Sequence, residues 1–304
     1  MRVFVTGATG FIGSAIVPEL IGSGHEVVGL ARSDRSAAAL AAAGAEVHRG
    51  DLDDPESLRA GAAAADGVIH CAFIHDFAQL ESSGRTDLRA VETFGAALEG
   101  TDRPLVVTSG IGLLAPGRVA TEDDAADPAS HAGHRVPSEV ATLALAARGV
   151  RSSLVRLPPS VHGEGDHGFV PVLLDIARRT GVSGYVGDGS SRWPAVHRLD
   201  AARLFRLALE AAPAGSVLHG VAEQGVPTRE IAAVIGRHLD VPVTAIAPED
   251  AGDHFGWLAA FFAADVPASS ALTRERLGWL PEQPGLIADL EAGHYFATAR
   301  PAAA

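Results

Sequence analysis

The sequence of 304 residues contains no lysine and no asparagine, one cysteine and two tyrosines. All 24 basic residues are therefore arginine. Because lysine and asparagine codons both begin with two adenines, a GC-rich coding sequence accounts for both absences. The lone cysteine, Cys71, cannot form a disulfide within the chain, which is typical of a reducing compartment. We expect a cytoplasmic location.

Long apolar runs and excess positive charge are also absent. No run of 18 apolar residues occurs, which argues against a membrane span. The first residues, MRVFVTG, are typical of a strand entering a glycine turn and leave no room for a signal peptide. A net charge of −13 argues against nucleic acid, because phosphate binding requires clustered basic side chains. We expect a small-molecule partner and neither nucleic acid nor membrane.

In the first half, short Val- and Ile-rich runs alternate with Ala-rich stretches, a pattern typical of βαβ units that build a parallel sheet. Strands are expected at 2–6, 26–30, 46–49, 67–70, 104–109 and 152–156. Helices are expected at 12–22, 36–43, 55–63, 87–99 and 138–148. The sequence thus predicts an α/β fold, a Rossmann-type doubly wound parallel sheet.

From about residue 163 the alternation breaks down, and short helices are expected at 200–211, 228–238, 249–260 and 284–291, the first with Asp200 as its N-cap. We predict that residues 1–162 mainly form the NADP-binding Rossmann domain. Residues 163–304 mainly form a small C-terminal substrate-binding lobe, with one or more segments returning to the sheet.

The first strand ends in Gly7-x-x-Gly10-x-x-Gly13, which opens a helix. Such a turn lets the backbone approach a pyrophosphate, and the helix N-terminus supplies amide donors. We therefore predict nucleotide binding by this turn, with Thr9, Phe11 and Ile12 as further contacts. The alternative is a glycine turn without a ligand.

The end of the second strand selects the cofactor. An NAD site places an acidic residue there to hold the ribose hydroxyls, whereas this chain has Ala31 followed by Arg32. Arg32 and Arg35 suit a 2′-phosphate, with Ser33 as a further donor, so NADP(H) is predicted over NAD(H). Asp34 would repel that phosphate if it pointed inward.

Six stretches in order, TGATGFIG, RGDLDDPESL, VIHCA, VVTSG, RLPPSVHG and VGDGSSRWPAVHRLDAARL, resemble the extended short-chain dehydrogenases/reductases, the NAD(P)-dependent epimerase/dehydratase relatives. The resemblance covers roughly residues 1–290. It implies that Asp51 and Leu52 lie near the adenine and that Pro158 lies near the nicotinamide. It further implies that His70, Cys71 and Ala72 line the cofactor path. It also implies a homodimer through the helices at 87–99 and 138–148.

The catalytic segment departs from that family. Where relatives carry Tyr-x-x-x-Lys followed four residues later by Glu, this chain has His131-x-x-x-Arg135-x-x-x-Glu139, which is similar to an atypical subgroup. The two tyrosines, Tyr185 and Tyr295, lie far away in the sequence.

The family's catalytic Ser or Thr falls on Gly110 by the simplest alignment, or on Ser109 after a one-residue shift. The candidate catalytic residues are therefore His131, Arg135, Ser109 and Thr108.

Reduction of a ketone requires a proton for the developing alkoxide. A histidine has an ordinary pKa of about 6.5, and a neighbouring arginine lowers it, so His131 would be mostly neutral at pH 7. Arg135 stays protonated and is expected to hold the ribose and stabilise negative charge. Pro137 predicts that the helix begins there, with His131 and Arg135 in a lead-in loop. The alternative is that both are surface loop residues.

Further candidates lie in the second half. Arg192 and Trp193 are assigned to substrate contact by charge and stacking, or else to domain packing. His162 begins HGEGDHG, which has metal-binding residue types without a regular ligand spacing. We predict no metal there and a substrate-gating loop instead.

Four aromatic residues near the C-terminus predict either an apolar pocket or an oligomer face: Phe255, Trp257, Phe261 and Phe262. Together these features predict an NADPH-dependent ketoreductase for a fairly apolar, polyketide-like carbonyl compound. The alternatives are a non-catalytic NADP(H)-binding sensor or scaffold and, third, a nucleotide-sugar epimerase or dehydratase.

Overall fold

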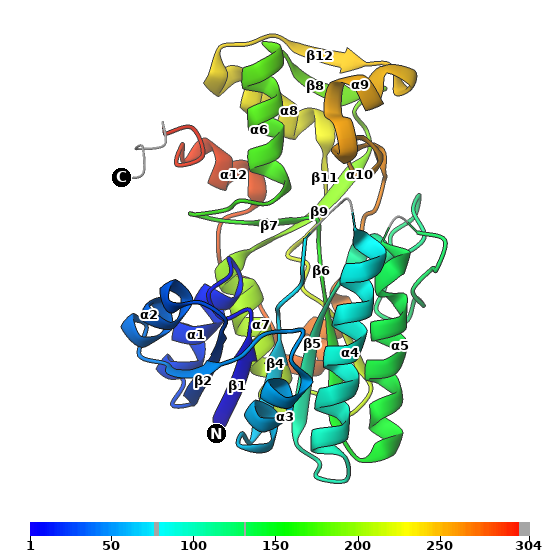
Figure 1. Cartoon of the computed structure of the whole chain (residues 1–304). Helices are drawn as coiled ribbons and strands as arrows, with labels where there is room; N and C mark the ends of the chain where they lie inside the picture. The colour runs from blue at the N-terminus through cyan, green and yellow to red at the C-terminus, as the bar shows by residue number, and fades with distance from the viewer. Residues whose placement is uncertain (76–78, 131, 298–304) are drawn as a thin grey trace.

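A seven-stranded parallel sheet forms the centre of the larger part of the molecule (Figure 1). The structure is a computed structural model and describes residues 1–75, 79–130 and 132–297. The strand order is β10-β6-β5-β4-β1-β2-β3. The strands are β1 Arg2–Thr6, β2 Glu26–Ala31, β3 Glu46–Arg49, β4 Gly67–His70, β5 Pro104–Gly110, β6 Arg151–Leu157 and β10 Ser216–His219. The predicted Rossmann-type doubly wound sheet is confirmed.

The six strands expected in the first half are all present, with ends that differ by at most one residue. Their Val- and Ile-rich runs form strands because both faces of the sheet are covered, as parallel sheets require. Val3, Phe4 and Val5 of β1 are completely buried. The seventh strand, β10, comes from the second half and pairs with β6.

Helices cover both faces of this sheet. Apolar side chains of α1 and α7 form one core with the sheet, joined by Leu40 of α2, and those of α3 and α4 form the other. The helices are α1 Gly13–Gly22, α2 Asp34–Ala42, α3 Pro55–Ala63, α4 Leu80–Leu98, α5 Val136–Ala144 and α7 Arg198–Ala211. Helix α4 begins seven residues earlier than expected. Helix α5 begins next to Pro137, as predicted, because the missing N–H of proline is tolerated in a first turn.

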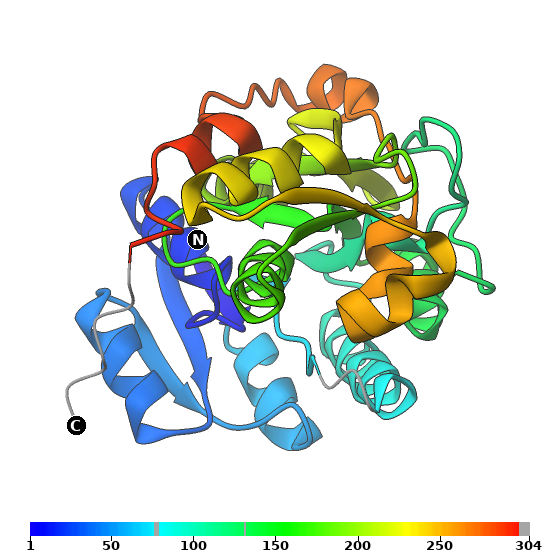
Figure 2. The ribbon, with the colours of Figure 1, turned by 90° about the horizontal axis from the view of Figure 1, so that it is seen from above.

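The rest of the second half forms a smaller lobe over the carboxyl ends of the sheet strands (Figure 1). The view from above shows the lobe lying across the sheet, with α6 end-on (Figure 2). Its strands are β7 Ser160–His162, β8 Ser183–Val186, β9 Arg192–His197, β11 Glu223–Pro227 and β12 Val243–Ile246. Its helices are α6 Phe169–Thr180, α8 Thr228–Leu239, α9 Ala251–Phe255, α10 Ala259–Ala263 and α12 Leu286–Glu291. The helix α11 Ala271–Leu277 packs instead against β10 and α7 of the larger part.

The pattern did not predict α6 or α11, and two other expectations are corrected. The single helix expected at 249–260 is divided into α9 and α10, because Gly256 turns the chain with a φ of 59°. Asp200 is not the N-cap of α7; His197 is, and it accepts the Leu199 amide. Asp200 lies in the first turn, where its buried carboxylate accepts the amides of residues 282 and 283. Nowhere in the described ranges is a helix both long and apolar enough to cross a membrane.

Candidate functional site

The glycine turn between β1 and α1 is a close-fitted backbone structure. Gly7 has a φ of 66°, and a Cβ on it would lie 2.7 Å from the Ala72 nitrogen. A Cβ on Gly13 would lie 2.0 Å from the Gly7 carbonyl oxygen. No side chain caps α1. The amides of Ser14 and Ala15 donate to backbone carbonyls, but within the described residues the amides at 11–13 have no hydrogen-bond partner and stay open to a ligand. Only glycine fits at positions 7 and 13, and the free backbone amides of the turn suit a phosphate.

An open groove of about 730 Å³ begins at this turn and crosses the carboxyl ends of β1 to β4. It brings together seven of the predicted cofactor residues: Gly7, Thr9, Arg32, Ser33, Arg35, Asp51 and Leu52. The predicted Gly10, Phe11, Ile12 and Gly13 belong to the same turn without lining the groove. The prediction missed further lining residues, namely Leu30, Ser36, Ala39, Gly50, Phe73, Ile74 and His75. Five of them lie at or just after strand ends, which is the signal that could have found them, whereas Ser36 and Ala39 lie within the helix at 34–42.

The charges at the end of β2 favour an anion. Arg32 and Arg35 are exposed and line the groove, and neither forms an ion pair or hydrogen bond within the described part of the chain. Asp34 pairs with Arg49, is 97% exposed and does not line the groove. Ser33 lines the groove and also has a structural role. Its hydroxyl accepts the Ser36 amide in the capping box of α2.

A buried chain of polar side chains runs from β1 to the segment before α5. The Thr6 hydroxyl lies 2.7 Å from Nδ1 of His70, and Nε2 of His70 lies 3.2 Å from Asp87 of α4. The other oxygen of Asp87 lies 3.8 Å from the Arg135 guanidinium. Burial alone would raise the pKa of Asp87, but the charge of Arg135 and the His70 hydrogen bond outweigh it and lower the pKa. Asp87 therefore carries the negative charge that faces Arg135.

Arg135, predicted as catalytic, is held at the end of β5. Its guanidinium donates to the Thr108 carbonyl at 2.7 Å and lies 4.2 Å from the Phe73 ring centre. The segment Gly133–Arg135 forms a single 3-10 turn that leads into α5. His131 lies outside the described residues, so its relation to Arg135 stays a prediction.

Two histidines share the Phe73 ring with Arg135. The ring centre of His75 is 5.2 Å from that of Phe73, and that of His134 is 6.0 Å away. Loss of solvent and then the charge of Arg135 lower the pKa of both imidazoles. Both rings are therefore biased toward the neutral form. Neither histidine was predicted as a site residue, although both flank predicted positions.

The hydroxyl groups of β5 are both engaged. Ser109 donates to Glu139 at 2.5 Å, and Glu139 forms two hydrogen bonds with the buried Arg156. The Thr108 hydroxyl donates to the sulfur of Cys71 at 3.3 Å. Burial raises the pKa of the Cys71 thiol to about 12. Cys71 is thus a neutral neighbour of the site and not a reactive thiolate.

Of the three predicted substrate contacts in the second half, Trp193 and His162 are buried inside the lobe, which corrects their assignment, whereas Arg192 is 39% exposed and engaged in an ion pair. Trp193 is completely buried, and its indole donates to the Phe261 carbonyl. His162 is 1% exposed and pairs with Asp289 at 2.8 Å. Arg192 forms two side-chain hydrogen bonds with Asp265. These side chains make contacts within the lobe. For Arg192 and Trp193, this agrees with the alternative prediction of domain packing.

The aromatic residues near the C-terminus divide into two groups. Phe255 and Phe262 are buried in the lobe core. Trp257 is 44% exposed and contacts Phe169 and Phe261. Pro158 is buried immediately after β6 and does not line the groove. Across the described residues, no group of three His, Cys, Asp or Glu side chains is placed to hold a metal ion.

Comparisons with known proteins identify relatives. The model of the NAD dependent epimerase/dehydratase family matches residues 3–107. An uncharacterized protein of Schizosaccharomyces pombe is 50% identical, over 97% of this chain and all of that one. A 2-alkyl-3-oxoalkanoate reductase of Stenotrophomonas maltophilia is 30% identical, over 76% of this chain and 73% of that one.

Among solved structures, the dTDP-glucose 4,6-dehydratase DesIV of Streptomyces venezuelae, with NAD bound, has a TM-score of 0.77. The match covers 96% of each chain at 20% identity. At that identity the likeness concerns the fold alone.

Proposed function

Because the chain belongs to the NAD dependent epimerase/dehydratase family of the short-chain dehydrogenase/reductase superfamily, we propose that it is an NADPH-dependent ketoreductase for an apolar carbonyl compound. The superfamily contains oxidoreductases and epimerases, which supports an enzymatic function. The Stenotrophomonas maltophilia relative is named as a reductase of 2-alkyl-3-oxoalkanoates. That name supports an oxo compound with an alkyl side chain as the substrate class.

The residues of the groove fit a nicotinamide dinucleotide. Because Gly7, Gly10 and Gly13 carry no side chains, a phosphate can approach the backbone of the turn closely. The N-terminus of α1, which no side chain caps, offers amide donors to it. Asp51 and Leu52 would face the adenine end. When bound, the reduced nicotinamide supplies a hydride for the carbonyl carbon.

The observation that carries the proposal is the charge at the end of β2. Arg32 and Arg35 line the groove without a carboxylate partner, where an NAD-dependent protein has an acidic residue. Two guanidinium groups that already lack partners would gain charge-assisted hydrogen bonds to a 2′-phosphate. The same two charges offer nothing comparable to a ribose hydroxyl, so NADPH is favoured over NADH.

Arg135 and His131 have separate roles in the proposed reaction. Arg135 cannot release a proton, so it stabilises the negative charge that develops on the carbonyl oxygen. His131 is the proposed proton donor. Arg135 lowers the pKa of His75 and His134, and its charge would act in the same direction on His131. Only the protonated imidazole of His131 can give this proton, so a lower protonated fraction makes this step slower.

The first test is a fluorescence titration with NADPH and NADH. The double variant Arg32→Ala/Arg35→Ala should lose at least about tenfold in NADPH affinity, while NADH affinity changes less than twofold. The matched control is Arg59→Ala, whose side chain is exposed on α3 and pairs with Glu56. Equal binding of NADPH and NADH by the unaltered protein would contradict the cofactor choice.

Turnover tests the reaction itself. NADPH consumption should be seen with 2-alkyl-3-oxoalkanoates or aromatic ketones, and His131→Ala should reduce it. Turnover of UDP- or dTDP-sugars with the cofactor retained would instead indicate an epimerase or dehydratase.

One observation favours a second candidate, a non-catalytic NADP(H)-binding sensor or scaffold. The hydroxyl of Ser109 is buried and donates to Glu139, so it is not free for a substrate. A sensor should bind NADPH tightly and reduce no ketone of a broad panel. In that case Gly10→Val abolishes every function, whereas His131→Ala changes none.

A further inference from the structure

The loop between β7 and α6 has little packing of its own. Between residues 163 and 168 it contains three glycines, and two of them, Gly163 and Gly165, have a positive φ. The side chain of Asp166 accepts the Gly168 amide and so closes the turn locally. A loop of this composition needs contacts from elsewhere to keep one conformation.

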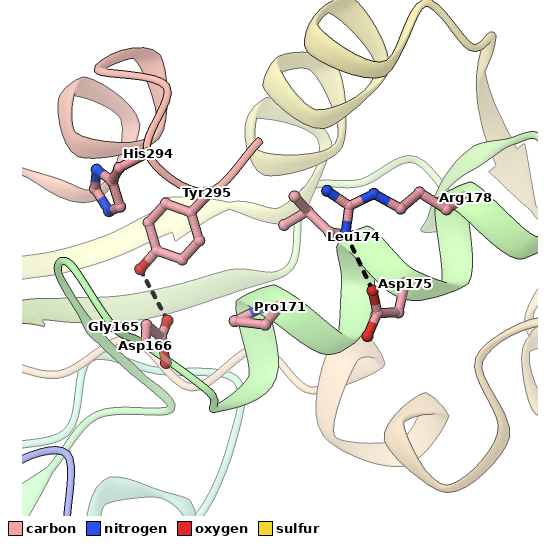
Figure 3. A pocket seen from close by; sticks show the side chains of 8 residues that line it. All are labelled: Gly165, Asp166, Pro171, Leu174, Asp175, Arg178, His294 and Tyr295. Atoms are coloured by element: carbon pink, nitrogen blue, oxygen red, sulfur yellow. Dashed lines mark hydrogen bonds and ion pairs between the residues drawn. The ribbon is translucent and has the colours of Figure 1, made fainter. Parts of the chain in front are cut away.

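A segment distant in sequence provides those contacts. The Tyr295 hydroxyl accepts the Gly163 amide at 3.1 Å and donates to the Asp166 carboxylate at 2.8 Å. One hydroxyl thus holds the loop at two points. In the close view, Tyr295 extends from the C-terminal segment toward Asp166 (Figure 3). Burial raises the pKa of Asp166, so its carboxylate has little water to replace this hydrogen bond.

The C-terminal segment is itself anchored to the lobe. Phe296 stacks on His238 of α8, with ring centres 4.2 Å apart and an interplanar angle of 7°. Asp289 of α12 lies 2.8 Å from His162 at the end of β7 and 3.9 Å from His294. Tyr295 therefore ties the loop at 163–168 to a C-terminal segment that is held in place by the lobe.

The other end of the loop lies against the glycine turn from which the groove begins. The ring of His167 is 5.7 Å from that of Phe11 in this turn, and Arg198 covers Phe11 at 5.3 Å. The loop thus packs against the turn that is expected to hold the pyrophosphate.

We infer that Tyr295 is a positioning residue of the cofactor site: it holds the loop at 163–168 so that His167 stays packed against Phe11 of the glycine turn and contacts the nicotinamide half of NADPH. This inference rests on the proposed binding of NADPH. A cavity of about 190 Å³, lined by Pro171, Leu174 and His294 among others, lies beside the Tyr295–Asp166 pair (Figure 3). It leaves room for the loop to withdraw when the hydroxyl is removed.

The test compares two ligands. NADPH extends past the glycine turn, whereas 2′-phospho-ADP-ribose ends before the nicotinamide. Tyr295→Phe keeps the ring and removes both hydrogen bonds. We expect its Kd for NADPH to rise about three- to tenfold, while its Kd for 2′-phospho-ADP-ribose changes less than twofold. Tyr185→Phe is the matched control, because Tyr185 is the only other tyrosine of the chain and lies in β8.

A second variant keeps the inference testable if Tyr295→Phe is poorly folded. Asp166→Ala should show the same selective loss. The loss in the double variant should be smaller than the two single losses combined, because the two changes share the Tyr295–Asp166 hydrogen bond. Equal NADPH affinities for Tyr295→Phe and Tyr185→Phe would overturn the inference. An equal loss for both ligands would overturn it too, because it would indicate general destabilisation. If the unaltered protein binds no NADPH, the proposed function fails first.

Discussion

Ser109 donates its hydroxyl to Glu139 at 2.5 Å, and both side chains are buried. Glu139 also compensates the charge of Arg156, which is 2% exposed. Glu139→Gln leaves that guanidinium without a counter-charge, so we expect a loss of about 3–5 kcal/mol in the free energy of unfolding. Ser109→Ala removes one hydrogen bond and should cost about 1–3 kcal/mol. Urea denaturation measures both.

The control for that prediction is an exposed pair of the same kind. Glu99 forms two hydrogen bonds with Arg148, and its side chain is 52% exposed. Glu99→Gln should change the free energy of unfolding by less than about 1 kcal/mol. Similar losses for Glu139→Gln and Glu99→Gln would show that burial does not decide the strength of these pairs.

Asp87 is expected to act on the reaction through Arg135. Asp87→Asn keeps the size of the side chain and removes the charge 3.8 Å from the guanidinium. Because Arg135 would lose part of its orientation, we expect kcat to fall by about ten- to hundredfold, with the Kd for NADPH within twofold of its original value. The control is Asp53→Asn, whose carboxylate pairs with Arg89 on the surface. A change in Kd without a change in kcat would refute this role.

The glycine turn gives a direct steric prediction. Gly13→Ala would place a Cβ 2.0 Å from a backbone oxygen, and the backbone cannot move away without opening the turn. We expect a loss of about 1–3 kcal/mol in stability and no measurable NADPH binding. Gly22 ends the same helix, and a Cβ there meets nothing within 4 Å. Gly22→Ala should therefore leave binding intact and stabilise the protein by up to about 1 kcal/mol.

His219 is expected to make folding sensitive to acid. It is completely buried, and burial lowers its pKa despite the hydrogen bond to the Ser269 carbonyl. Glu122, Glu139 and Arg156 are the charged groups that act on it. Below a pH of about 6.5 the unfolded chain binds a proton that the folded protein does not. Stability is therefore fully present above that pH and is lost as the pH falls toward the lowered pKa.

Denaturation at pH 7.5, 6.5 and 5.5 measures this effect. The loss should approach about 1.4 kcal/mol per pH unit for each histidine of this kind. His75, His134 and His197 also have lowered pKa values, so they add to the slope. His219→Gln should reduce the slope by one histidine's share. An unchanged slope in that variant would assign the acid sensitivity to the other groups.

Local patterns determined a large part of this protein. The strands of the first half, the glycine turn and Arg32 could be predicted because each depends on neighbours within a few residues: apolar periodicity, a positive φ, and the position just after a strand. The parallel sheet follows, because βαβ units bring all strand ends to one edge. For that reason Gly7, Arg32 and Asp51 were predicted together and are found along one groove.

Only the tertiary structure decided how the polar groups are paired. Thr6, His70, Asp87 and Arg135 come from four separate elements, and no local spacing indicates that they form one buried chain. Trp193 looked suited to stacking on a substrate, but it is buried in the lobe core, where the rings of Phe169 and Phe262 pack against it. Tyr295 reaches a loop 129 residues earlier in the sequence. Such contacts depend on which surfaces meet when the chain folds. Local patterns in one sequence do not indicate which distant residues will be paired.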